Sequence, residues 1–117
     1  MSTLRNRVQL IGRVGQAPEI KTFEGGTKRA QFSIAVNEMY YNEKNERVEN
    51  TYWHFVVGWG KVADIIEKFV DKGKEVAIDG KLTSRNYEDK EGNKRYVTEV
   101  IINEILLFSD KDLVRNK

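Results

Sequence analysis

Apolar and polar residues alternate with a period of two along five segments of this chain, which is the pattern of a strand that buries one face. In the first segment, Val8, Leu10, Gly12 and Val14 fall on one side. The segments predicted to be strands are residues 7–14, 30–37, 51–60, 75–87 and 95–108. The chain is therefore expected to fold mainly into sheet.

One further segment, which begins at residue 61, changes from the period of a strand to that of a helix. Its apolar residues recur at the i, i+3, i+4, i+7 and i+8 positions of one helical stripe, at Val62, Ile65, Ile66, Phe69 and Val70. Acidic residues come early and basic residues late, and Gly73 is the expected C-cap. The pattern predicts a helix between the third and fourth strands.

Turn-forming residues separate the remaining segments. Pro18 and the pair Gly25–Gly26 predict two turns around a short extended piece, with a hairpin between the first and second strands. Residues 38–50 are polar without a clean period, so we expect a long excursion between strands there. The pair Gly92–Asn93 predicts a turn inside a hairpin of the last two strands.

Antiparallel pairing closed into a small barrel is the arrangement that this order of elements favours. Each parallel pair would need a crossover, and only one helix is expected. Gly12 and Gly80 interrupt strands at points where a barrel is expected to bend. The predicted fold is all-β with one helix: a five-stranded OB-fold Greek-key barrel whose helix lies between strands three and four.

The composition excludes several kinds of chemistry. The 117 residues fit one domain, and the absence of cysteine excludes disulfides, thiolate metal sites and cysteine nucleophiles. The only histidine, His54, cannot build a multi-histidine metal site, and no acid–base pair stands at a recognisable spacing. No apolar run has the length of a membrane span or the form of a signal peptide, so a cytoplasmic location is expected.

Positive charge is concentrated in the first third of the chain. The formal net charge is only +2, but residues 1–37 carry six Lys and Arg against two Glu. This distribution is compatible with a polyanionic partner, although charge alone favours one only weakly.

The stretch TYWHFVVGWGK, residues 51–61, places Trp53, Phe55, Val57 and Trp59 on one face of the third strand. Such a stripe is either core or an open platform on which flat groups stack. Further tyrosines stand in polar segments, close to Lys and Arg in the sequence. This mixture of rings and cations favours a binder of single-stranded nucleic acid over a protein with ordinary surface rings.

A resemblance to the bacterial single-stranded DNA-binding proteins, a family of OB-fold proteins, covers about residues 4–108. It rests on four stretches in the same order: NRVQLIGRVGQAPEIK, AQFSIAVNE, WHFVVGWGKVADIIEKFVDKGKEVAIDGKL and RYVTEVIINEI. The resemblance implies an OB-fold domain over residues 1–108 that binds single-stranded DNA without catalysis and irrespective of its sequence. It further implies a role in replication, recombination and repair, usually as a homotetramer, at the nucleoid of a bacterial cell.

The same resemblance assigns roles to individual residues. Stacking rings are implied at Tyr40, Trp53, Trp59 and Tyr87, and phosphate contacts at Arg7, Lys21, Lys61, Lys72, Arg85 and Arg95. His54 matches a histidine that the family uses near its subunit interface, whereas Phe55 falls where some members carry a cation, so its role stays open. Neither a cofactor nor a metal is implied.

Residues 109–117, SDKDLVRNK, are predicted to form a short C-terminal extension. Members of the family usually continue into a Gly/Pro/Gln-rich linker and an acidic tip that recruits replication and repair enzymes. This stretch has neither, so recruitment of partners through a tail is not expected. Three alternatives stay open: a dimeric primosome-type OB protein, an OB-type nuclease that uses magnesium or calcium, and an RNA binder.

Overall fold

Six strands and one helix make up the part of the chain that the computed structural model describes, residues 4–108. They are β1 (Val8–Val14), β2 (Glu19–Thr22), β3 (Lys28–Tyr41), β4 (Arg47–Trp59), α1 (Lys61–Phe69), β5 (Glu75–Glu88) and β6 (Lys94–Leu107). The predicted extension at residues 109–117 lies outside the described residues.

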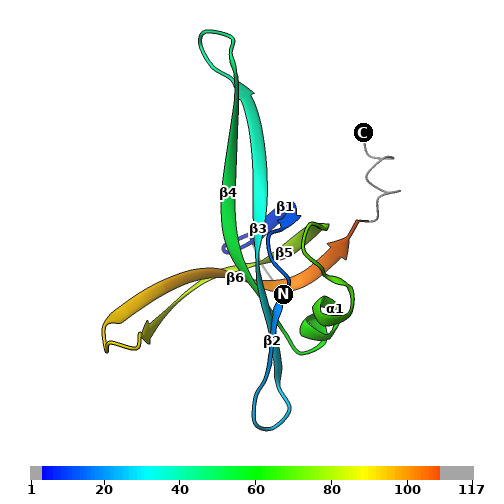
Figure 1. The fold of residues 1–117 in the computed structure, drawn as a ribbon, viewed down its shortest axis with the longest axis vertical. Coiled ribbons are helices and arrows are strands. Elements are labelled where there is room, and N and C mark those ends of the chain that lie inside the picture. Colours follow the sequence, from blue (N-terminus) through cyan, green and yellow to red (C-terminus); the bar gives the residue numbers. More distant parts are fainter. Residues whose placement is uncertain (1–3, 109–117) are drawn as a thin grey trace.

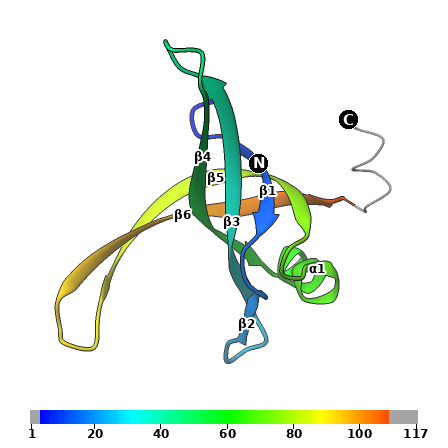
Figure 2. The same ribbon diagram turned by 45° about the horizontal axis from the view of Figure 1, so that its top comes forward.

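Five of the described strands close into a barrel, as Figures 1 and 2 show. They follow the order β1-β5-β6-β4-β3, and β1 pairs again with β3 to complete the ring. All neighbours are antiparallel except β4 and β6, which run parallel through Val56 opposite Val100 and Val57 opposite Ile101. The predicted OB barrel with its helix before the fourth barrel strand is therefore confirmed.

The segment predicted as a long excursion, residues 38–50, is instead the outer half of a hairpin. Pairing between β3 and β4 continues without interruption to Tyr41 opposite Arg47. A short turn joins the two strands, with Asn45 at a φ of 62°. This arm projects from the barrel (Figure 1), so neither of its faces enters the core. The alternation that marks a half-buried strand is therefore missing from its sequence, which is why the prediction was wrong.

The Gly25–Gly26 turn joins β3 to β2 rather than to the first strand. Both glycines have φ near +90°, which is the conformation that a residue without a side chain adopts most easily. Register pairs of β2 and β3 run from Glu19 opposite Gln31 to Thr22 opposite Lys28. The predicted short extended piece is thus a strand of its own. The first and second predicted strands do pair antiparallel, at Arg13 opposite Ala35 and Val14 opposite Ile34, but β2 lies between them in the chain, so no turn joins them directly as a hairpin.

The core lies inside the barrel and beneath α1. Its buried side chains come from every barrel strand and from the helix: Val14, Ala30, Phe32, Ile34, Val56, Ala63, Ile66, Val70, Val76, Ile78, Val100 and Ile102. Glycine stands where two backbones approach closely, because a Cβ at Gly12 would overlap the carbonyl of Ala35 and one at Gly80 that of Ile101. The register also shifts between Asp79 and Gly80. Close approach of a neighbouring strand thus requires glycine at both positions, and at Gly80 the strand is also irregular where the sequence predicts a bend.

The helix α1 contacts the barrel through a narrower stripe than its sequence suggests. Ala63 and Ile66 are buried, whereas Ile65 and Phe69 are exposed, although the pattern placed them in the buried stripe. Lys28 of β3 ties the helix to the sheet through ion pairs of 2.9 Å to Asp64 and 2.7 Å to Glu67, which raise the pKa of its ammonium.

The end of α1 also differs from the prediction. Val70 is the C-cap, and its N–H donates to the carbonyl of Ile66. Gly73 lies further on, in the turn that leads to β5. The helix stops at Phe69 because the chain turns there to bury Val70 in the core.

Candidate nucleic-acid interface

A row of aromatic side chains along β4 faces away from the core. Trp53 is 61% exposed, Phe55 52% and Trp59 42%, whereas Val57 between them is buried. The opposite row of β4 supplies the core with Val56. The stripe that the sequence left open between core and platform is therefore an exposed surface, although the small Val57 is covered by its neighbours.

Trp53 packs against the end of β1. A Cβ at Gly15 would overlap the ring of Trp53, so only glycine leaves room for the indole there. The backbone around Gly15 is fixed: its N–H donates to the carbonyl of Ser33 at 2.9 Å, and the N–H of Gly73 donates to that of Val14 at 2.8 Å. The second bond ties the turn that carries Lys72 to the same end of β1. Trp53 thus lies on a rigid support.

Trp59 stacks on Phe23, with 5.8 Å between the ring centroids and 25° between their planes. Two cations lie over the Phe23 ring, Lys21 at 4.8 Å and Arg29 at 5.3 Å. The row of rings therefore continues from β4 onto the β2–β3 turn. Sequence reasoning missed Phe23; the available signal was an aromatic residue in a polar turn segment, two positions after Lys21.

The outer half of the β5–β6 hairpin, which ends at Glu88 opposite Lys94, projects from the barrel as a second arm (Figure 1). From this β5–β6 arm, Tyr87 brings a ring to the same side of the sheet. The registers of β3–β4, β4–β6 and β5–β6 place it on the face that carries Trp53. The guanidinium of Arg85 lies 5.7 Å from its ring centroid and donates to Glu99 at 3.1 Å. Arg85 therefore covers part of Tyr87 and is held there by a carboxylate.

The turn of the same arm is organised by Asp89. Its side chain accepts from the N–H groups of Glu91 and Asn93 at 2.9 Å and from Arg95 at 3.0 Å. The pKa of Asp89 is lowered, first by the bond from the Asn93 backbone and then by Arg95, because these donors stabilise the carboxylate. Arg95, a predicted phosphate contact, is thus engaged by an acidic partner.

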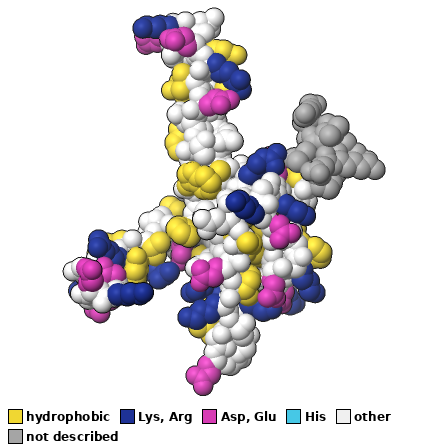
Figure 3. Space-filling model, viewed as in Figure 1, with side chains coloured by type: hydrophobic (Ala, Val, Ile, Leu, Met, Phe, Trp, Pro, Cys, Tyr) yellow, Lys and Arg dark blue, Asp and Glu magenta, His cyan; other side chains and the backbone are white. Residues whose placement is uncertain are grey.

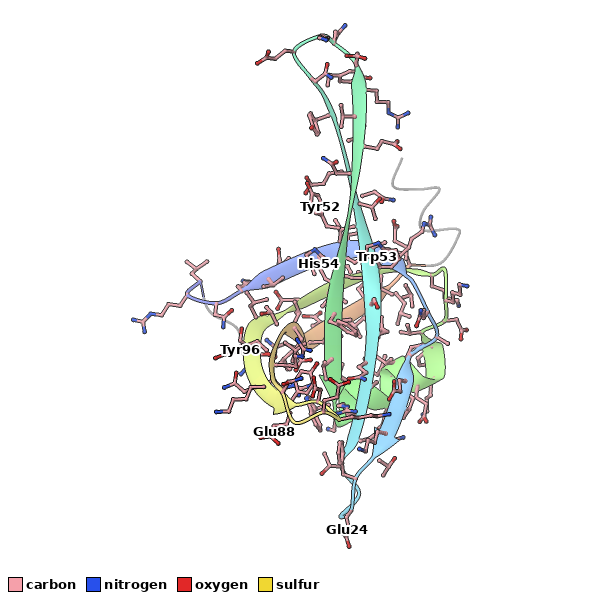
Figure 4. The ribbon with its side chains drawn as sticks, turned by 60° about the vertical axis from the view of Figure 1, so that its left-hand side comes forward. Glu24, Tyr52, Trp53, His54, Glu88 and Tyr96 are labelled. Atoms are coloured by element: carbon pink, nitrogen blue, oxygen red, sulfur yellow. The ribbon has the colours of Figure 1, made fainter. Side chains whose placement is uncertain are left out.

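Two predicted site residues lie apart from these rings. Tyr40 pairs with Val48, in the row of Tyr52 and His54, and Figure 4 shows Tyr52 and His54 on the other side of β4 from Trp53. Arg7 is ion-paired to Asp79 at 3.0 Å and lines a different hollow, between β1 and the ends of β5 and β6. The structure therefore joins Trp53, Trp59 and Tyr87 on one face but not Tyr40.

The predicted phosphate contacts divide into two groups. Within residues 4–108, Lys21, Lys61 and Lys72 are exposed and form no ion pair with a carboxylate. The other three, Arg7, Arg85 and Arg95, are each held by one. In the view of Figure 3, cationic side chains are spread over the barrel and arms among acidic ones, with apolar side chains along both arms. Three lysines are therefore available to an anion without breaking an ion pair.

Residues 4–108 hold no group of three or more His, Asp and Glu placed to share a metal ion. Among the same residues, no helix combines the length and apolar character needed to cross a bilayer.

The fold and this face define a class of protein: an OB barrel with an open row of rings, two projecting hairpins and lysines at its margin, the arrangement used to bind single strands of nucleic acid. The sequence model of the single-strand binding protein family matches residues 5–108. The chain belongs to this family.

Named relatives agree with that assignment. The chain is 38% identical to single-stranded DNA-binding protein 1 of Xylella fastidiosa, over 91% of this chain and 79% of that protein. It is 36% identical to single-stranded DNA-binding protein 1 of Chlorobaculum tepidum, over 92% and 67%.

Solved structures show the same fold. A Plasmodium falciparum SSB in complex with ssDNA superimposes with a TM-score of 0.80 at 34% identity, over 93% of this chain and 98% of that one. A deletion mutant of the single-stranded DNA binding protein from Thermus aquaticus also reaches 0.80, at 24% identity, which bears on the fold alone.

Proposed function

We propose that this chain binds single-stranded DNA by stacking bases on an open aromatic face, with little dependence on sequence. The observation that carries the proposal is the exposed row of Trp53, Phe55 and Trp59, continued by Tyr87 on the neighbouring arm. A row of exposed aromatic rings is an apolar patch in contact with water, which is typical of a surface that a flat partner covers. Every base has a π face, so such a row accepts any sequence.

Aromatic stacking and charged side chains make separate contributions to the proposed binding. Bases stack on Trp53, Trp59 and Tyr87, and the strand reaches Tyr40 by passing around the β3–β4 arm, because that ring lies on its other side. Lys21, Lys61 and Lys72 contact phosphates first, since none of them has a carboxylate partner within residues 4–108. Arg7 and Arg95 exchange a carboxylate for a phosphate when the strand comes near, whereas Arg85 keeps its bond to Glu99 and contacts a phosphate through its other N–H groups. Phe23 supports Trp59 from below.

We further propose that the protein binds DNA without catalysis. It would act in DNA replication, recombination and repair, at the nucleoid in a bacterial cytoplasm. The rival from another class is a metal-dependent nuclease. Incubation of an end-labelled single strand with the protein and magnesium or calcium separates the two: the strand is expected to remain intact, and cleavage would favour the nuclease.

A homotetramer is the proposed assembly, with a dimer as its rival. A hollow of about 650 Å³ lies between β1 and the ends of β5 and β6, and the apolar side chains of Ile11 and Leu106 beside it are exposed. Val36, which lines this hollow, is in the same row as His54. Subunits that pack here would cover both the hollow and the side of β4 that carries His54. Native mass spectrometry should give four chains, and two chains would favour the dimer.

Fluorescence anisotropy of labelled oligo(dT) tests the proposed binding. The single strand is expected to bind at low salt, and the same strand within a duplex is expected to bind far more weakly because its bases are already stacked. Competition with oligo(rU) addresses the RNA alternative, since stacking alone does not read the sugar. Failure of oligo(dT) to bind at low salt would contradict the proposal.

A further inference from the structure

A hollow of about 250 Å³ opens on the ring-bearing face where the β5–β6 arm leaves the barrel. Its lining comes from four strands: Gln31 of β3, Phe55 of β4, Arg85 and Tyr87 of β5, and Val97 and Glu99 of β6. The registers place these side chains on the side of the sheet that carries Trp53. The hollow therefore lies within the proposed path of a single strand.

Glu99 is an unexpected residue on a surface for a polyanion. It is 7% exposed, and no other buried residue of the described chain is polar or charged. Its Oε1 accepts from Arg85 Nε at 3.1 Å, while no donor within residues 4–108 reaches its Oε2. A carboxylate repels phosphate, and it already neutralises Arg85. The hollow is thus unsuited to the backbone of a strand.

The other groups of the hollow suit a base. Phe55 and Tyr87 supply aromatic walls from two different strands, and both rings are about half exposed. The side-chain amide of Gln31 forms no hydrogen bond within the described part of the chain. Stacking surfaces thus surround one free carboxylate oxygen and one free amide, which is a set of groups that can read the edge of a base.

We propose that this hollow binds a nucleobase with an exocyclic amine and thereby favours cytosine over thymine. The free oxygen of Glu99 accepts from the N4 amine of cytosine, whereas thymine presents the O4 acceptor at that position. The amide of Gln31 donates to the ring nitrogen or O2 of the same base. This inference rests on the proposed binding of single-stranded DNA, adds a preference at one position of the path, and gives Phe55 a stacking role.

Affinities of oligo(dC) and oligo(dT), measured by competition at neutral pH, test the proposal. Replacing Glu99 by Gln keeps the size of the side chain but offers a donor to thymine. We expect Glu99→Gln to lower the ratio of the affinity for oligo(dC) to the affinity for oligo(dT) by about fivefold, because one base-edge contact is lost. Glu88→Gln is the matched control, because it removes the same charge from an exposed residue of the same arm (Figure 4) and should leave the preference unchanged.

The outcomes separate this inference from the proposed function. If Glu99→Gln folds as judged by circular dichroism, binds both oligomers, and keeps the preference of the unmodified protein, the base site is contradicted and Glu99 only positions Arg85. Phe55→Ala provides a second variant: it should weaken oligo(dC) more than oligo(dT), and equal weakening would also contradict the base site. Failure of the unmodified protein to bind either oligomer would instead contradict the proposed function.

Discussion

Trp53 is the most exposed side chain of the aromatic row on β4, and its position is set by a residue 38 places earlier in the chain, Gly15. A large ring that is both exposed and held in place is ready to stack without first losing rotamer freedom. The sequence indicated the row on β4, because its large apolar residues alternate with period two from Trp53 to Trp59. It could not indicate the contacts of Trp59 with Phe23, because these depend on a turn that folds back onto β4.

Replacing Trp53 by Ala should weaken binding of oligo(dT) by about 1–3 kcal/mol, the range for loss of one stacked base. Tyr52→Ala is the matched control, since Tyr52 is a neighbouring exposed ring on the other side of β4. Fluorescence anisotropy with labelled oligo(dT) gives both affinities. Equal losses in the two variants would show that the face with Trp53 has no special role.

Asp89 should titrate below the ordinary range of an aspartate, because the Asn93 backbone and Arg95 stabilise its charged form. A lowered pKa means that these bonds stabilise the turn fully above the pKa of the unfolded chain, about 4, and are lost as the pH falls through the folded value. Carboxyl chemical shifts from NMR, followed against pH, give that midpoint. Arg95→Gln should raise it part of the way, and a midpoint at or above 4 in the unmodified protein would contradict the account.

The elements divide into those that enclose the core and those that project from it. Barrel strands and α1 were predicted from their periods, because burial of one face imposes a pattern on the sequence. Residues 38–50 carry no such pattern, since neither face of this hairpin is buried in the core, and the strand there was missed. Tyr40 shows the consequence: without the register of this arm, its side of the sheet could not be predicted.

At the scale of the element, Gly80 allows β5 to approach β6. A Cβ there would overlap the carbonyl of Ile101, so Gly80→Ala should lower the free energy of unfolding by about 1–3 kcal/mol, the usual cost of overpacking. Urea denaturation measures this change. The adjacent exposed Lys81 is the control, as Lys81→Ala should change stability by no more than about 0.5 kcal/mol. Equal stabilities of the two variants would contradict the close approach.

For the whole molecule, the arrangement of charge matters more than its total. The net charge of +2 is small for a binder of DNA, but unpaired lysines lie beside exposed rings while several arginines are engaged by carboxylates. Composition could therefore predict a polyanion partner only weakly. Which cations are available depends on ion pairs between residues far apart in the chain, such as Arg7 with Asp79, and these follow from the fold.

The salt dependence of binding should show whether the lysines without an ion pair contact phosphates. Each phosphate contact contributes about 0.7 to the slope of log K against log salt for a single strand. Lys61→Ala, two residues after Trp59, should reduce the slope by about that amount. Lys68→Ala removes the same charge from the last turn of α1 and should leave the slope unchanged. Equal slopes for Lys61→Ala and the unmodified protein would show that Lys61 contacts no phosphate.

Tryptophan fluorescence during a titration with oligo(dT) tests the central claim most directly, because both tryptophans of the chain lie in the proposed stacking row. At low salt, the fluorescence should be quenched in a saturable way, and salt should reverse the quenching. Trp53→Phe and Trp59→Phe should each retain part of it, since the other indole still stacks. An unchanged emission at low salt, with folded protein and excess oligo(dT), would contradict the account.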